Sequence, residues 1–485
     1  MKKTRTRFAP SPTGYMHIGN LRTALFEYLI ARHENGDFLL RIEDTDQERQ
    51  VEGAEAMIYK TLKDCGLNWD EGPDVGGDFG PYVQSERLPM YKGYAEKLIE
   101  LGGAHYCFCS EEEIEAQRKE AESLGVSFKF EDPCSHLSKE EIQARLDAGD
   151  PYVIRQTIHN VGETYFDDMV YGHIEFDGDL LDEQILIKSD GFPTYNFANI
   201  IDDHTMEISH VVRGNEYLSS TPKYNLIYDA YGWERPSYVH VPPVMKDEHH
   251  KLSKRNGDAS FQDLVEKGYL PDAIINYLAL LGWSPATDQE IYTMEELIEN
   301  FDISRISKSP AIFDIDKLTW MNGVYLRNMD EETYYETVRP YLEEAVKGGY
   351  DRRLLAKIIQ PRIDVLNQIG EAVDFIDELP DYDLSMYTHK KMKTNPEVAL
   401  KALKEAQTAL EKVDDWNEEN LHTVLLALPK ELGMKNGQVL WPVRTAVSGK
   451  SFTPGGAIEL AAVLGKDESL RRIAIGIERL EDALA

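Results

Sequence analysis

The chain has 485 residues, of which 42% are apolar, and a formal net charge of −34 at pH 7. This composition supports sizeable cores and excludes a disordered chain, while the length predicts roughly two to four domains. The acidic total excludes a general nucleic-acid binder, although local basic patches can still bind RNA. A polar N-terminus, four cysteines and no apolar run of about 18 residues predict a cytosolic protein without a leader peptide, a membrane span or a disulfide scaffold.

The stretch 7–20, R-F-A-P-S-P-T-G-Y-M-H-I-G-N, predicts a strand, a tight turn and the start of a helix. Pro10 stops the apolar run that begins at Phe8, and apolar residues recur with helical spacing after the turn. The first turn of a helix offers free N–H groups and a positive dipole end, so an anion can bind there. His17 and Gly19 lie at that position, and Gly19 lets a ligand approach the backbone. The alternative is an ordinary strand–helix turn with one satisfied histidine.

A second strand is predicted at 38–42 and runs directly into Glu43-Asp44-Thr45-Asp46. A strand, a helix and a strand in this order favour a parallel α/β sheet. Carboxylates just beyond the carboxyl end of such a strand lie where open α/β sheets bind ligands. A solvated acidic loop is the alternative interpretation.

Further elements follow along the chain. Helical patterns occur at 55–65, 90–101, 111–124, 221–230, 272–281 and 294–300, and strand patterns occur at 152–155, 185–187, 208–212 and 239–244. From residue 330 onward the pattern is a succession of capped helices, which predicts an all-α region. Basic patches at 352–353, 390–393 and 471–472 could contact phosphates, although each is also typical of a solvated surface.

Two pairs of possible metal ligands lie close together in sequence. Cys107-x-Cys109 is followed, 25 residues later, by Cys134-x-His136. Two close pairs separated by a long loop suit a tetrahedral zinc site, and thiolates with an imidazole suit zinc better than magnesium or calcium. The sequence therefore predicts a structural zinc site, with a chance grouping of buried cysteines as the alternative. The fourth cysteine, Cys65, is predicted to be a core residue.

Two more segments carry functional side chains. Residues 189–199 form a Gly/Pro turn that leads into a helix, and Arg213 follows the strand at 208–212. An arginine at that position can hold a substrate carboxylate bidentately. The basic loop K-L-S-K-R at 251–255 suits a developing pyrophosphate charge in a nucleotide-binding fold, although such a loop alone is usually a solvated face.

In their order, these segments resemble the class I aminoacyl-tRNA synthetases, and in detail the bacterial glutamyl-tRNA synthetase family. Residues 17–20, H-I-G-N, resemble the H-I-G-H motif, and 251–255 resemble the K-M-S-K-S motif. The resemblance covers essentially the whole chain. Its supporting stretches are 80–87, 193–197, 281–284, 307–309, 442–449 and 464–466.

The resemblance implies a Rossmann-type parallel-sheet catalytic domain of the α/β class, with an inserted zinc subdomain and an all-α C-terminal region. The expected parts are the two halves of the catalytic domain at 1–92 and 191–243, the acceptor-stem-binding insertion at 93–190, a stem-contact domain at 244–327 and the anticodon-binding region at 328–485. The insertion would hold zinc through Cys107, Cys109, Cys134 and His136.

It also implies roles for individual residues. The expected catalytic residues are His17, Gly19, Asn20, Lys251, Ser253 and Lys254. ATP would contact Pro10, Ser11, Thr13, Gly14, His17, Gly19, Asn20 and Lys254. Glutamate would contact Arg7, Ala9, Ser11, Glu43, Tyr195, Asn199 and Arg213, with Gly214 and Glu216 beside them. Arg362 is the candidate for reading the third anticodon base.

The implied reaction has two steps. Glutamate attacks the α-phosphate of ATP to give glutamyl-adenylate and pyrophosphate, and tRNA(Glu) then takes the glutamyl group. Mg²⁺ would accompany ATP, zinc would be structural, and the protein would act as a monomer without a membrane partner. Arg362 favours an enzyme that charges tRNA(Glu) and rejects tRNA(Gln). Asn20 and Arg255 depart from the two family motifs; Asn20 weakens one phosphate contact, while an amide can still donate.

Four alternatives fit part of the chain. Glutaminyl-tRNA synthetase has a β-barrel anticodon region, whereas this end has helical patterns. A short paralogue that glutamylates a modified tRNA base lacks an anticodon domain. A nucleotidyltransferase would explain 7–20 but nothing after about residue 257. An RNA-binding scaffold would explain the helical half and leave Arg7, Glu43 and Arg213 without a role.

Overall fold

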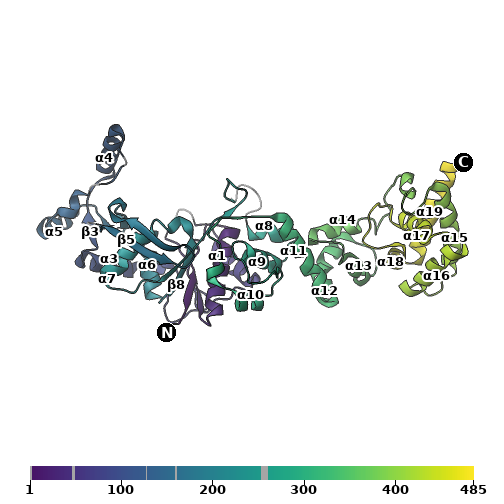
Figure 1. The fold of residues 1–485 in the computed structure, drawn as a ribbon, viewed down its shortest axis with the longest axis horizontal. Coiled ribbons are helices and arrows are strands. Elements are labelled where there is room, and N and C mark those ends of the chain that lie inside the picture. The colour runs from purple at the N-terminus through teal and green to yellow at the C-terminus, as the bar shows by residue number, and fades with distance from the viewer. Residues whose placement is uncertain (1–2, 46–49, 127, 131, 159–160, 253–259) are drawn as a thin grey trace. The chain divides into compact units, whose positions relative to one another are not determined.

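The computed structural model describes residues 3–45, 50–126, 128–130, 132–158, 161–252 and 260–485. The chain folds as two compact units (Figure 1). The first consists of Met1–Val265 and Pro271–Asp314, and the second of Glu266–Leu270 and Ile315–Ala485. Every residue assigned above to ATP, glutamate or zinc belongs to the first unit, and Arg362 belongs to the second.

The first unit is a mixed α/β structure, as the sequence predicts. Its strands are β1 Arg5–Phe8, β2 Asp37–Leu40, β3 Ala104–Cys107, β4 Val153–Gln156, β5 Glu163–Asp168, β6 Gly172–Asp177, β7 Ile185–Ile187, β8 His210–Gly214, β9 Ser237–Val241, β10 Val244–Met245 and β11 Ala311–Ile312. Its α-helices are α1 Ile18–His33, α2 Ala54–Asp64, α3 Leu88–Glu100, α4 Glu111–Leu124, α5 Lys139–Ala148, α6 Tyr195–Thr205, α7 Thr221–Tyr231, α8 Phe261–Glu266, α9 Pro271–Leu280 and α10 Met294–Asn300. Short 3-10 helices lie at η2 Gln84–Arg87, η3 Pro133–His136, η4 Gly178–Leu180, η5 Asn215–Tyr217 and η7 Ile303–Arg305.

Parallel pairing dominates around the predicted site. β1 pairs with β2, and β8 pairs with β9, both in parallel. The backbone N–H of Ser209 donates to Arg5 O at 3.0 Å, so the two parallel pairs lie side by side. β5 joins β9 through the parallel pair Asp168 and Tyr238, and an antiparallel hairpin connects β5 to β6. A separate antiparallel sheet has the order β3-β4-β7.

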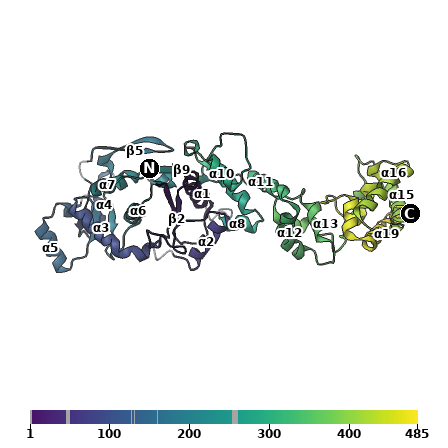
Figure 2. The same cartoon turned by 90° about the horizontal axis from the view of Figure 1, so that it is seen from below.

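Helix α1 packs against the parallel strands β1, β2 and β8 (Figure 2). Leu21, Leu25 and Leu29 are fully buried, as the helical spacing of apolar residues predicts. The packing fixes the N-terminus of α1, which begins at Ile18, beside the carboxyl ends of β1 and β2. That edge of a parallel sheet is where α/β proteins bind ligands.

In the second unit the regular elements of residues 315–485, all of which the structure describes, are helices joined by turns and loops. Its helices are α11 Ile315–Asn328, α12 Glu331–Ala345, α13 Arg352–Ile359, η8 Leu366–Gln368, α14 Ile369–Val373, η9 Leu384–Tyr387, α15 Pro396–Glu411, α16 Glu418–Glu431, α17 Asn436–Ser448, α18 Ala457–Leu464 and α19 Lys466–Leu484. Asp330, Asp351 and Asn395 accept backbone hydrogen bonds as the N-caps of α12, α13 and α15. The predicted all-α region is therefore confirmed. The five-part domain division stays a prediction.

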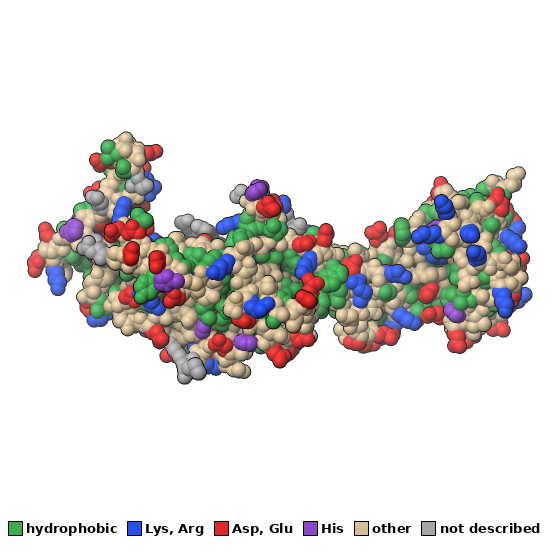
Figure 3. Space-filling view, viewed as in Figure 1, with side chains coloured by type: hydrophobic (Ala, Val, Ile, Leu, Met, Phe, Trp, Pro, Cys, Tyr) green, Lys and Arg blue, Asp and Glu red, His purple; other side chains and the backbone are tan. Residues whose placement is uncertain are grey.

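The surface shows how the acidic charge is distributed. On the face in Figure 3, acidic and basic side chains are interspersed over each unit. Local basic contacts thus remain available despite the acidic total. No described helix has both the length and the apolar character needed to cross a bilayer.

Candidate functional site

The predicted turn between β1 and α1 has the expected form. His17 is the N-cap of α1, and its Nδ1 accepts a hydrogen bond from Gly19 N at 3.0 Å. A Cβ at position 19 would lie 3.1 Å from His17 Nδ1, so glycine keeps this capping contact relaxed. Gly14 has φ of 113°, a conformation that favours glycine, and Asn20, Ser11 and Thr13 are exposed at the mouth of the turn. The helix N-terminus is thus open toward an anion.

His17 also connects this turn to the K-L-S-K-R segment. Because Nδ1 accepts, the proton lies on Nε2, which donates to Leu252 O at 3.1 Å. Ser260 forms a β-bridge with His17, and Phe261 N donates to Met16 O at 3.3 Å. Both described flanks of the segment are therefore held at the turn. Lys251 is exposed, while Ser253 and Lys254 lie outside the described residues.

The acidic strand end reaches the same turn. Glu43 N donates to Pro10 O at 3.0 Å, so the backbone after β2 lies against the turn after β1. The Glu43 side chain is buried and accepts from Arg41 at 3.1 Å. Burial raises the pKa of Glu43 to about 6, although Arg41 and Arg7 act against that increase. The alternative of a solvated acidic loop therefore does not describe the environment of Glu43.

Beneath the turn lies a buried network of ion pairs. Arg7 contacts Asp203 through Nε at 2.9 Å and NH2 at 3.2 Å, and its NH1 contacts Glu27 at 3.3 Å. Burial alone would lower the pKa of Arg7, but Asp203 raises it overall. Arg41 also contacts Asp203, at 2.8 Å. All three guanidinium nitrogens of Arg7 are therefore engaged by protein carboxylates.

Arg213 is bound differently. Its Nε donates to His240 Nε2 at 3.1 Å and its NH2 donates to Thr221 Oγ1 at 2.7 Å. Among the described residues, no carboxylate forms an ion pair with Arg213, and NH1 has no hydrogen-bond partner. A buried guanidinium in this state favours an incoming carboxylate.

Tyr195 and Asn199 lie at the start of α6 beside these charges. Asn199 is buried and its amide donates to Tyr195 O at 2.8 Å. Burial raises the pKa of Tyr195, and Glu43 adds to the increase while Arg213 and Arg7 act against it. The Tyr195 ring lies 5.6 Å from the ring of Tyr217, which in turn lies 5.3 Å from the guanidinium carbon of Arg213. The structure thus brings together most residues expected to contact glutamate, and Ala9 is half-buried beside Pro10.

The cysteine cluster forms a second centre in the first unit. The sulfur atoms of Cys107, Cys109 and Cys134 and a carboxylate oxygen of Asp132 all lie within 4.8 Å of one another. His136 ends η3, is exposed, and is not one of these four groups. Three thiols form a soft donor set that fits zinc. The three predicted cysteines therefore converge, while Asp132 occupies the place expected for His136.

Asp132 already has several partners. It accepts from Cys134 N at 2.8 Å, and its other oxygen lies 3.0 Å from His105 Nε2 and 3.3 Å from Arg155 Nε. Burial alone would raise the pKa of Asp132, but its hydrogen bonds with the side chains of His105 and Cys107 and with Cys134 N lower it overall. Burial also raises the pKa of Cys107 to about 11 and further raises that of Cys109. A metal ion that binds here must therefore displace thiol protons.

In the second unit, Arg362 lines a cavity of about 620 Å³. The loop after α17, residues 449–454, also lines this cavity, and its Phe452 is 93% exposed. An exposed aromatic ring beside a cationic side chain is typical of surfaces that stack and read unpaired bases. Sequence reasoning missed Phe452, although its position between Ser451 and Thr453 in a loop with glycines and a proline gave a usable signal.

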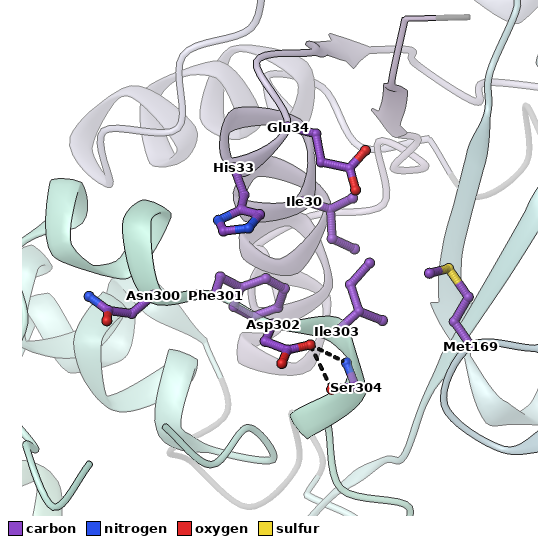
Figure 4. A pocket seen from close by; sticks show the side chains of 9 residues that line it. All are labelled: Ile30, His33, Glu34, Met169, Asn300, Phe301, Asp302, Ile303 and Ser304. Atoms are coloured by element: carbon purple, nitrogen blue, oxygen red, sulfur yellow. Dashed lines mark hydrogen bonds between the residues drawn. The ribbon is translucent and has the colours of Figure 1, made fainter. Parts of the chain in front are cut away.

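Another cavity, of about 550 Å³, lies at the opposite end of α1 (Figure 4). Ile30, Met169, Phe301 and Ile303 give it apolar walls, and none of the predicted site residues lines it. Cavity size alone therefore does not locate the site. A cavity of only about 10 Å³ does touch the predicted residues Asn199 and Arg213, together with Asp203.

Four polar residues of the first unit escaped the sequence argument. Asp203 and Glu27 contact Arg7, while His240 contacts Arg213 and is itself bound by Asp168. Each is buried within a helix or strand, so its only sequence signal is a polar residue at a core position. Which partner each residue meets depends on contacts between distant segments.

Comparisons with known proteins agree with this geometry. Residues 3–320 match the family model described as "tRNA synthetases class I (E and Q), catalytic domain", and residues 325–477 match the model described as "Anticodon binding domain". The chain is 60% identical over 482 residues to the glutamate–tRNA ligase of Clostridium tetani, with 99% of each chain covered. It is 59% identical over 478 residues to that of Clostridium acetobutylicum, which covers 98% of this chain and 99% of the relative.

A solved structure gives the same result. The crystal structure of a glutamate tRNA ligase from Elizabethkingia meningosepticum, in complex with its amino acid, superimposes with a TM-score of 0.91. The two chains are 35% identical, and the match covers 99% of this chain and 100% of the other.

Proposed function

This chain belongs to the glutamate–tRNA ligases, a family of class I tRNA synthetases, and on this basis we propose that it activates L-glutamate with ATP and transfers the glutamyl group to the 3′ end of tRNA(Glu). The observation that supports this most directly is the buried guanidinium of Arg213, which has no described carboxylate partner and lies near Tyr195 and Glu43. An amino acid that carries two carboxylates supplies the carboxylate partner that Arg213 lacks.

The substrate would bind through complementary charges. Arg213 holds one carboxylate of glutamate, and Arg7 adds positive charge below it. The Tyr195 hydroxyl and the Asn199 amide donate hydrogen bonds, and the Glu43 carboxylate accepts from the ammonium group. Ser11 and Ala9 close the side formed by the turn. Binding of this kind orients the α-carboxylate toward ATP.

ATP would bind at the N-terminus of α1. Its phosphates lie against Pro10, Ser11, Thr13 and Gly14, with His17, Gly19 and Asn20 at the helix end. An α-carboxylate oxygen of glutamate attacks the α-phosphorus, the bond to the β-phosphate oxygen breaks, and pyrophosphate leaves. Lys251, Ser253 and Lys254 stabilise that departing charge, and Mg²⁺ accompanies the nucleotide.

The second step releases AMP. A hydroxyl of the terminal ribose of tRNA attacks the activated carbonyl, and the carbonyl–phosphate bond breaks. The helical unit binds the anticodon, with Arg362 at the third base. We further propose that Cys107, Cys109 and Cys134 hold a structural zinc ion, with His136 as the fourth ligand, and that the enzyme works as a cytoplasmic monomer.

A pyrophosphate exchange assay tests the proposal. Glutamate-dependent exchange of labelled pyrophosphate into ATP is expected, with a strong increase when tRNA(Glu) is added. Glutamine is the matched control because it replaces one carboxylate by an amide of similar size. Exchange with glutamine but not glutamate, or no exchange with either amino acid, would refute the proposal.

A further inference from the structure

Three buried polar residues form a chain that ends at the proposed glutamate site. Asp168 ends β5, His240 lies on β9, and Arg213 lies on β8. Asp168 Oδ2 lies 2.6 Å from His240 Nδ1, and His240 Nε2 lies 3.1 Å from Arg213 Nε. Asp168 is 3% exposed and His240 is fully buried. Their contacts therefore form away from bulk water.

The hydrogen bonds define which imidazole nitrogen carries the proton. Arg213 Nε always carries a hydrogen, so His240 Nε2 must accept. The imidazole proton then lies on Nδ1 and is donated to Asp168. Asp168 is itself fixed, because its Oδ1 accepts from Val170 N at 2.9 Å and from Tyr171 N at 2.8 Å, and its Oδ2 accepts from His240 N at 3.1 Å. Backbone groups thus orient the carboxylate, and the carboxylate fixes the tautomer of the histidine.

The same arrangement turns the guanidinium of Arg213. His240 Nε2 accepts from Nε of Arg213, and Thr221 Oγ1 accepts from NH2 at 2.7 Å. The Thr221 hydroxyl donates its own hydrogen to Tyr217 O at 2.8 Å. The rings of Tyr217, Tyr224 and Tyr238 lie 4.9 to 5.3 Å from the guanidinium carbon. NH1 is the nitrogen left without a described partner. The contacts on one edge leave the opposite edge for a ligand.

We propose that Asp168 and His240 are positioning residues for amino-acid recognition, which fix the guanidinium of Arg213 so that NH1 and the remaining hydrogen of NH2 meet a substrate carboxylate. This inference rests on the proposed function, since it assigns the carboxylate to glutamate. Neither residue touches the substrate. A preoriented guanidinium binds a carboxylate without losing rotamer entropy at the moment of binding.

The chain also predicts how glutamate recognition responds to pH. A proton on Nε2 of His240 would convert the acceptor into a donor that faces Arg213. The charged groups that face the imidazole are Asp168 and Glu216, which favour protonation, and Arg213, which opposes it; Thr221 and nearby aromatic rings are neutral. Burial lowers the pKa of His240, so the neutral form persists at neutral pH. The KM for glutamate should rise when acidification protonates His240.

Two substitutions at one position test the acceptor. In His240→Gln an amide oxygen can replace Nε2 as the acceptor for Arg213. In His240→Asn the shorter amide reaches the place of Nδ1 and contacts Asp168 but not Arg213. Loss of a hydrogen bond to a charged group should raise the KM for glutamate in His240→Asn by about tenfold or more, with kcat changed less, and His240→Gln should retain most of the wild-type KM.

The controls separate positioning from general damage. The KM for ATP should stay constant, and His210→Asn, at the start of the same strand as Arg213, should leave the KM for glutamate unchanged. Equal KM values for glutamate in His240→Asn and His240→Gln would overturn the inference, as would a parallel increase in the KM for ATP. Absence of exchange in the wild-type enzyme would instead refute the proposed function.

A measurement on the unmodified protein covers the case in which a variant does not fold. Nitrogen-15 spectra of the full chain with labelled histidine should show one buried imidazole protonated on Nδ1 at neutral pH. Loss of that signal in folded His240→Gln protein assigns it to His240. If that variant does not fold, the KM for glutamate against pH decides in Glu43→Gln protein, which lacks the carboxylate whose pKa is about 6. An Nε2-protonated His240, or a glutamate KM in Glu43→Gln protein that does not rise on acidification, would overturn the inference.

Discussion

Glu43 shows how burial adapts a carboxylate to its proposed task. Burial raises its pKa to about 6, so it is largely ionised at neutral pH and becomes protonated in mild acid. Only the ionised form accepts strongly from the ammonium group of glutamate. The KM for glutamate should therefore fall as the pH rises through about 6, and Glu43→Gln should remove this inflection while raising the KM at pH 8 by about tenfold. The pH profile of the glutamate KM in pyrophosphate exchange, recorded for the wild-type protein and Glu43→Gln, measures this inflection.

The same shift has the opposite effect on stability. Between the unfolded pKa of about 4.5 and the folded pKa of about 6, the folded protein holds a proton that the unfolded chain has released. The contribution of Glu43 to stability is therefore present at low pH and decreases as the pH rises through this range.

An identical pH profile of the glutamate KM in Glu43→Gln and wild-type protein would contradict the role of Glu43 in binding the ammonium group.

Lys254 is expected to act on the leaving group rather than on the amino acid. A charge that meets pyrophosphate only as it departs lowers the barrier more than it improves ground-state binding. Lys254→Ala should therefore lower kcat for activation on the order of 10² to 10³ with a smaller change in KM. Lys251→Ala serves as the comparison within the segment. A normal kcat with a raised KM for glutamate would show that the role is wrong.

At the scale of elements, the short helix η3 connects the zinc hypothesis to the fold. It carries Cys134 and His136, and its N-cap Asp132 points into the cysteine cluster. Purified protein should contain about one zinc per chain, and Cys109→Ser should lower this content. Cys65→Ser is the control and should leave the zinc content unchanged, because Cys65 is the C-cap of α2 and lies far from the cluster in sequence. Elemental analysis provides the readout.

Two further variants identify the fourth ligand. Loss of zinc in His136→Ala with retention in Asp132→Asn is the expected result, because Asp132 already accepts from His105 and Cys134. The reverse result would assign Asp132 to the metal. Full zinc content after removal of both Cys107 and Cys109 would refute the site.

Local elements were predictable where short-range chemistry decides them. The segments α4, α10 and β7 agree with the sequence patterns at both ends, and Asp330, Asp351 and Asn395 mark helix starts through their own side chains. The hairpin of β5 and β6 was missed. It alternates exposed and half-buried residues and contains several charges, so its pairing depends on the neighbouring β9.

The candidate site was predictable only in part, for a related reason. His17, Glu43 and Arg213 stand at strand ends or helix starts, where local sequence indicates a ligand edge. Asp203 and His240 lie inside elements and gain their roles from partners 196 and 27 residues away. No short-range pattern encodes such pairs. Asp132 lies beside the three thiols, and it was missed because a lone carboxylate two residues before Cys134 does not match a paired ligand spacing.

At the scale of the whole molecule, the helical unit should decide which tRNA is charged. Arg362 and the exposed ring of Phe452 line the same cavity. A guanidinium suits a cytosine edge, whereas a guanine at that position is bulkier and presents donors of its own. We expect efficient charging of tRNA(Glu) and poor charging of tRNA(Gln), and a gain of tRNA(Gln) charging in Arg362→Gln. Charging both transcripts side by side measures this.

Lys450→Gln is the matched control, because it removes another positive charge that lines the cavity without changing Arg362. This substitution should reduce the charging of both tRNAs to a similar extent. Comparable wild-type efficiency on the two tRNAs would contradict the expected discrimination.

The buried ion-pair network also bears on how this family can change during evolution. Arg7, Arg41 and Arg87 share four carboxylates, those of Glu27, Glu43, Asp202 and Asp203. Removing one buried partner leaves an unpaired charge, at a cost of about 3 to 5 kcal/mol, so single steps away from this arrangement are strongly disfavoured. Paired changes cost less, because the free-energy effects of substitutions at contacting residues are not additive. A lineage that moved toward a neutral amino acid would thus need coordinated substitutions in β1, α1 and α6, and ancestral sequences along that path should show them changing together.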